Sequence, residues 1–145
     1  MGETAQSRMT EYSDRRVWDL KGLRAVQINI AFTFDIICLD TCSDDNDNEV
    51  FIRIENTFTY KSPNRITSCH PEDIDSIKEA ISVLRFDLDD LTAFRDGRLQ
   101  VRFIGGQDLQ VKQHFQFESW EAHGRGKFRD LALLCSSQEG PPWSE

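Results

Sequence analysis

The sequence has no long apolar run, few cysteines and little positive charge. No stretch approaches the roughly 18 consecutive apolar residues of a membrane-spanning helix, and residues 1–16 contain no apolar signal-peptide segment. The net charge is −8, from 17 basic and 25 acidic residues, which argues against a broad nucleic-acid-binding surface, because such binding depends on Lys and Arg at phosphates. We therefore expect a cytoplasmic protein that binds neither nucleic acid nor a membrane.

The four cysteines are too sparse to indicate a disulfide framework, so we expect free and mostly buried thiols. Cys38, Cys42, Cys69 and His70 could nominally ligate zinc. Their spacing does not form two tight metal-binding turns, and Cys38 lies on an apolar strand face. Cys38 and Cys135 are better interpreted as small core residues. No metal and no other cofactor is expected.

The length of 145 residues suits one domain, and ten Phe and three Trp can fill its core without disulfides. The polar N-terminus predicts a tail over residues 1–16, followed by a single β-rich domain over residues 17–145. In residues 26–39, apolar side chains alternate with polar ones, which predicts two strands with a bend near residues 31–33. The alternating set is Ile28, Ile30, Phe32, Phe34, Ile36 and Cys38.

A different periodicity follows in residues 71–84. Ile74, Ile77, Ile81 and Leu84 lie three and four residues apart, and Pro71 suits a first helical turn. This pattern predicts one amphipathic helix whose four apolar side chains pack on a sheet.

Strand patterns resume after residue 84, with hairpin signals at Asp96-Gly97 and Gly105-Gly106. Residues 23–60 and residues 84–117 show the same order of a strand, a second strand, a break and a third strand. We interpret this as an internal duplication of a three-stranded unit. The predicted fold is α+β, with antiparallel β-meanders that form a sandwich or a barrel-like sheet and one helix packed on it.

Residues 96–124 carry a recognisable pattern of turns, alternating apolar residues and an aromatic-Glu-x-Trp segment. Its positions are Asp96, Gly97, Leu99, Val101, Phe103, Gly106, Leu109, Val111, Phe117, Glu118, Trp120 and Gly124. With this pattern the chain resembles an uncharacterised family of small bacterial proteins. The resemblance implies a fold class but no established activity. A likeness to small acidic β-rich proteins encoded beside toxin genes suggests an immunity role.

The densest charge lies in residues 44–49, where Asp44, Asp45, Asp47 and Glu49 fall within six positions. Asp44, Asn46, Asn48 and Glu55 match part of the spacing of a calcium loop, but Glu49 occupies the position that needs Gly, and a strand pattern follows. A solvated loop is the simpler interpretation. Like charges so close repel one another, so we expect this loop to serve as a docking surface for a basic partner.

A second polar cluster follows residue 113. His114, Glu118, Glu121 and His123 could support acid-base chemistry, but no nucleophile or phosphate-binding motif accompanies them, so no enzyme is predicted. Trp120 is either a binding anchor or a core residue. Glu118, Trp120 and Glu121 therefore join the four acidic residues as candidate binding residues.

Two functions remain open at this point. One is a non-enzymatic protein-binding protein, such as an immunity protein that neutralises a toxin by electrostatic complementarity and steric block. The alternative is a module that holds a small ligand in the concavity between two half-sheets.

Overall fold

The structure is a computed structural model that describes residues 8–41, 47–113, 119–135 and 140–144. These residues form twelve strands, one short α-helix and two 3-10 helices. The strands are β1 Met9–Glu11, β2 Arg15–Asp19, β3 Leu23–Ile30, β4 Phe34–Asp40, β5 Glu49–Ile54, β6 Phe58–Ser62, β7 Arg65–Cys69, β8 Leu88–Phe94, β9 Leu99–Phe103, β10 Asp108–Val111, β11 Trp120–Arg125 and β12 Ala132–Cys135. The helices are α1 Ile74–Ile77, η1 Ala80–Val83 and η2 Gly126–Phe128.

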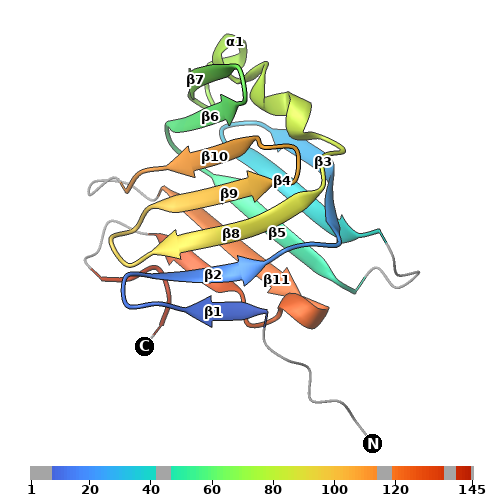
Figure 1. Cartoon of the computed structure of the whole chain (residues 1–145). Coiled ribbons are helices and arrows are strands. Elements are labelled where there is room, and N and C mark those ends of the chain that lie inside the picture. Colours follow the sequence, from blue (N-terminus) through green and yellow to red (C-terminus); the bar gives the residue numbers. More distant parts are fainter. Residues whose placement is uncertain (1–7, 42–46, 114–118, 136–139, 145) are drawn as a thin grey trace, which may run out of the picture.

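The strands form two stacked sheets (Figure 1). The seven-stranded sheet has the order β1-β2-β8-β9-β10-β6-β7, and the five-stranded sheet behind it has the order β12-β11-β5-β4-β3. Every pair of neighbouring strands is antiparallel. The fold is therefore an α+β sandwich with separate sheets. Of the two architectures that the sequence predicted, the sandwich is present rather than the barrel-like sheet.

The alternation in residues 26–39 does produce two strands, β3 and β4, which pair through a tight turn at residues 31–33. One residue of the predicted inward set is wrong. Phe32 is 78% exposed, because it occupies the tip of this hairpin rather than a strand position. The alternation of apolar residues continues through residues 31–33 in the sequence, but the extended backbone is interrupted there by the turn.

The two predicted three-stranded units are both present. β3, β4 and β5 form a meander within the five-stranded sheet, and β8, β9 and β10 form a meander within the seven-stranded sheet. The hairpin signals also lie at turns, where Gly97 and Gly106 have φ of 97° and 93°. Only glycine adopts such angles without strain. That the two units arose by duplication stays a prediction.

The helical segment predicted over residues 71–84 is shorter than expected, and a different set of its side chains is buried. It consists of α1 and η1, and its buried side chains are Ile77, Ala80 and Val83. Ile74 is 57% exposed and Leu84 is 37% exposed, so only part of the predicted apolar face packs on the core. The tightening to a 3-10 helix changes the period from 3.6 to three residues per turn, which moves the buried face to positions 77, 80 and 83.

Part of the predicted tail over residues 1–16 is wrong, because residues 9–11 and 15–16 lie in strands, while residues 1–7 lie outside the described residues. β1 pairs with β2, and β2 pairs with β8, so residues 9–16 extend the seven-stranded sheet. At the other terminus, the Trp143 ring lies beneath the guanidinium groups of Arg16 and Arg95, at 4.5 and 5.5 Å from its centroid. Trp143 is the aromatic plug of this edge of the core.

One cluster of buried side chains forms the core, and the completely buried Trp120 belongs to it. Trp120 belongs to β11 of the five-stranded sheet, and its indole N–H donates a hydrogen bond of 2.8 Å to the carbonyl of Gly97, in the β8–β9 turn of the other sheet. The Cys135 thiol donates to the same oxygen at 3.3 Å. This carbonyl therefore joins the two sheets.

The three described cysteines, Cys38, Cys69 and Cys135, are free and buried. Burial raises the pKa of Cys69 and of Cys135 to about 11, and it also raises the pKa of Cys38. At pH 8 only about one such thiol in a thousand is the reactive thiolate.

We predict that iodoacetamide leaves these three residues unmodified in the native protein at pH 8, and that all three react in guanidinium, as read by peptide mass spectrometry. Rapid native alkylation of Cys38 would contradict its place in the core.

Candidate functional site

The outward positions of the five-stranded sheet form three rows across its strands. The first row is Leu134, Glu121, Arg53, Asp35 and Asn29; the second is Ala132, His123, Phe51, Ile37 and Gln27; the third is Arg125, Glu49, Leu39 and Arg24. We call these residues the five-strand face. It is turned away from the seven-stranded sheet, toward the back of the molecule as drawn in Figure 1.

Apolar side chains occupy the centre of the five-strand face. Ile37 and Phe51 are register partners on β4 and β5, and Leu39 follows Ile37 on the same side of β4. All three are half-buried, and Leu134 at the edge is 46% exposed. The outward positions of a sandwich sheet are ordinarily polar. A group of aromatic and branched side chains at outward positions is a feature of protein-binding surfaces.

An ion-paired row crosses the same face. Arg53 binds Asp35 through two hydrogen bonds of 3.0 Å, and Thr33 donates to the same carboxylate at 2.8 Å. The hydrogen bond to Asp35 raises the pKa of the Arg53 guanidinium. Asp35 is only 5% exposed, so this pair organises the face rather than contacting a partner. Glu121, the next residue of the row, has a side chain that is 24% exposed.

The last two residues of the acidic run, Asn48 and Glu49, make hydrogen bonds and an ion pair within the protein. Asn48 is buried; its side-chain oxygen accepts a hydrogen bond of 3.0 Å from the Lys127 backbone N–H, and its amide donates to Asp40 at 3.3 Å. Glu49 forms an ion pair with Arg125 across the β5–β11 register. Asp47 is exposed directly before them.

The candidate binding residues therefore separate into groups. Asp47, Glu49 and Glu121 lie on or beside the five-strand face. Trp120 is completely buried, so its interpretation as a binding anchor is corrected and the core alternative holds. Asp44, Asp45 and Glu118 lie outside the described residues.

The calcium and zinc sites considered from the sequence do not form among the described residues. Asn48 and Glu55 flank the extended strand β5, so their side chains start about 23 Å apart and cannot share a calcium ion. Cys38 lies on β4 of one sheet, whereas Cys69 ends β7 of the other. In the part of the chain that the structure describes, no three His, Cys, Asp or Glu side chains gather in a way that could hold a metal ion. His114 and Glu118 of the polar cluster, and Cys42 and Asn46, lie outside that part.

The Glu121–His123 pair is the described remainder of the polar cluster. The imidazole Nε2 lies 3.7 Å from a Glu121 carboxylate oxygen, and the His123 side chain is 50% exposed. Both side chains stand on the five-strand face beside Phe51 and Arg53. A protonated His123 would add positive charge beside Glu121 on this face.

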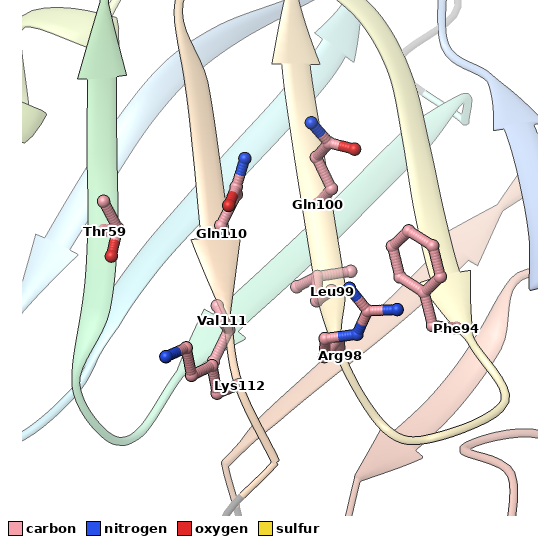
Figure 2. Close-up of a pocket in the computed structure, with 8 residues that line it drawn as sticks. All are labelled: Thr59, Phe94, Arg98, Leu99, Gln100, Gln110, Val111 and Lys112. Atoms are coloured by element: carbon pink, nitrogen blue, oxygen red, sulfur yellow. The ribbon is translucent and has the colours of Figure 1, made fainter. Parts of the chain in front are cut away.

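The seven-stranded sheet carries a hollow on its own outer side (Figure 2). It has a volume of 190 Å³ and is lined by Thr59, Phe94, Arg98, Leu99, Gln100, Gln110, Val111 and Lys112, from β6, β8, β9 and β10 and the chain beside them. We call it the seven-strand pocket. Sequence reasoning proposed none of these residues as a binding site, because they come together only through the pairing of four strands.

No described helix is long and apolar enough to cross a membrane. The two antiparallel sheets and the short helical segment define the molecule as an α+β sandwich. A family model, the family of unknown function DUF6188, matches residues 19–135, so the chain belongs to that family. The match confirms the resemblance to an uncharacterised family. No curated protein and no solved structure matches the chain.

Proposed function

We propose that this is a non-enzymatic protein-binding protein that docks a basic partner on the five-strand face. The observation that carries the proposal is the apolar centre of Ile37, Leu39 and Phe51, flanked by the carboxylate of Glu121 and by the Glu49–Arg125 ion pair. Protein interfaces have this arrangement, in which apolar groups are buried at the centre and polar groups surround them.

Charge supports a basic partner rather than an acidic one. The protein has a net charge of −8, and the connection from β4 to β5 carries Asp44, Asp45 and Asp47 in sequence immediately before Glu49. A negative field of this kind accelerates the approach of a positively charged protein and disfavours other partners.

An inhibitor is the member of this class that fits best, since a rigid sheet face can cover an active site without any chemistry of its own. An immunity protein that neutralises a toxin is one such inhibitor. We place its action in the cytoplasm, because buried free thiols such as Cys38, Cys69 and Cys135 are typical of proteins in reducing compartments.

The alternative of a ligand held between the two sheets has less support. The inward side chains of both sheets belong to one packed core, including Trp18, Phe34, Ile52, Leu91 and Trp120. A ligand would have to displace these side chains. A ligand-binding role is better served by the seven-strand pocket on the outer surface.

The proposal predicts that Phe51→Lys weakens binding of a basic partner, because it places a cation at the centre of the interface. Val17→Lys is the matched control, since Val17 is also half-buried and outward, but on β2 of the other sheet. We expect a partner captured from native extract by the wild type and purified to bind Val17→Lys equally, and Phe51→Lys at least about 30-fold more weakly.

Calorimetry on the purified partner gives the affinities, and thermal melts establish that both variants are folded. Association should also slow as salt shortens the Debye length from about 10 Å at 0.1 M to about 3 Å at 1 M. Equal affinities of Phe51→Lys and the wild type for the partner would show that the five-strand face is not the binding surface.

A further inference from the structure

The seven-strand pocket combines a concave shape with hydrogen-bond donors that are not used by any of the described residues. Gln100 and Gln110 are register partners on β9 and β10, and Thr59 is the register partner of Gln110 on β6. Figure 2 shows these three side chains along one side of the hollow, with Phe94, Arg98 and Lys112 along the other. The pocket is open to solvent on a face independent of the five-strand face.

Arg98 is held in place but keeps donors for a ligand. Its Nε donates to both oxygens of Asp96, at 3.1 and 2.9 Å, and its guanidinium carbon lies 4.2 Å from the centroid of the Phe94 ring. The described residues accept no hydrogen bond from its two terminal nitrogens. The stacking on Phe94 and the contact with Asp96 therefore orient the guanidinium group, and its two terminal nitrogens remain available to donate to a ligand.

Four other side chains add donors and acceptors. Among the described residues, the Lys112 ammonium has no ion pair, and the side chains of Gln100 and Thr59 have no hydrogen-bond partner. The Gln110 amide donates to Asp108 at 3.1 Å, which leaves its oxygen as an acceptor. A ligand would thus find cationic donors on one side and neutral amide and hydroxyl groups on the other.

The charge balance selects a monoanion. Asp96 neutralises Arg98, so Lys112 supplies an excess of about one positive charge at the pocket. One excess charge matches a carboxylate better than a dianionic phosphate. A planar carboxylate can also accept two parallel hydrogen bonds from the guanidinium edge.

The size selects a small group. At 190 Å³ the pocket is smaller than the roughly 300 Å³ at which ligand sites for drug-sized molecules begin. The ring of Phe94 provides an apolar wall for the body that carries the charge. We propose that the seven-strand pocket binds a carboxylate on a short body, either a small free acid or the acidic side chain of a peptide.

The test is a titration of the ¹⁵N-labelled protein followed by NMR. The probes are benzoate, for a free acid, and the blocked peptide acetyl-Ala-Glu-Ala-amide, for an acidic side chain; benzamide and acetyl-Ala-Gln-Ala-amide are their neutral counterparts. We expect the side-chain NH₂ signals of Gln100 and Gln110 and the Nε–H signal of Arg98 to shift with an affinity of about 1 mM for at least one acidic probe. The tighter of the two acidic probes identifies the source of the carboxylate.

Lys112→Gln should weaken that affinity about tenfold, because it removes a charged hydrogen bond. Gln100→Glu should abolish binding by placing a carboxylate in the pocket. Lys61→Gln is the matched control, since Lys61 lies on the outer side of β6, two residues from Thr59, outside the pocket. No shift with either acidic probe, equal shifts with the neutral probes, or an equal loss in Lys61→Gln would each overturn the proposal.

Discussion

Trp120→Ala is expected to lower the free energy of unfolding by about 4 kcal/mol, since truncating a buried Trp or Phe to Ala typically costs about 3–5 kcal/mol. The side chain is completely buried between the sheets, and its indole N–H supplies the 2.8 Å hydrogen bond to Gly97. The variant therefore loses both core volume and a link between the sheets. Urea unfolding measures the change.

Trp120→Phe separates the two contributions. Phenylalanine keeps much of the apolar volume but cannot donate to the Gly97 carbonyl, so we expect a smaller loss of about 1–2 kcal/mol. The Cys135 thiol would remain the donor to that oxygen. A Trp120→Ala protein as stable as the wild type would contradict the position of Trp120 in the core.

Gly124→Ala is expected to destabilise the protein by about 3 kcal/mol or more, through overpacking against rigid backbone. A β-carbon at Gly124 would lie 2.0 Å from the carbonyl oxygen of Phe128 and 2.7 Å from its carbonyl carbon. The Gly124 N–H also donates to Leu131 at 2.9 Å, so the strand cannot move away without losing this contact. The melting temperature should fall by roughly 10 °C.

Gly105→Ala is the matched control for this substitution. There a β-carbon would meet only the flexible end of the Gln107 side chain, at 2.7 Å, and the residue is exposed. We expect a change within about 1 kcal/mol, the ordinary range for a surface substitution. Equal melting temperatures for Gly124→Ala and Gly105→Ala would show that β11 and η2 do not approach as closely as described.

The sequence predicted the central strands well because their signals are local. Alternation in residues 26–39 gave β3 and β4, and the glycines at positions 97 and 106 marked the turns on either side of β9. Phe32 and Leu84 were assigned to the interior incorrectly, since periodicity does not show where a hairpin turns or where an α-helix tightens into a 3-10 helix.

Features that depend on distant pairing escaped prediction. β1 and β2 look like a polar tail until β8 provides the edge on which they pair. The apolar centre of the five-strand face has the same origin, because Ile37 and Phe51 become neighbours only through the β4–β5 register. The acidic run was visible in the sequence, but the structural use of Asn48 and Glu49 was not.

The most direct test of the proposed function is hydroxyl-radical footprinting of the protein, free and in complex with its captured partner. We predict that binding protects Phe51, Leu39 and Leu134 on the five-strand face from oxidation and leaves Phe94 on the seven-stranded sheet as reactive as in the free protein. Unchanged oxidation of Phe51 and Leu134 in the complex, together with protection of Phe94, would contradict the assignment of the binding surface.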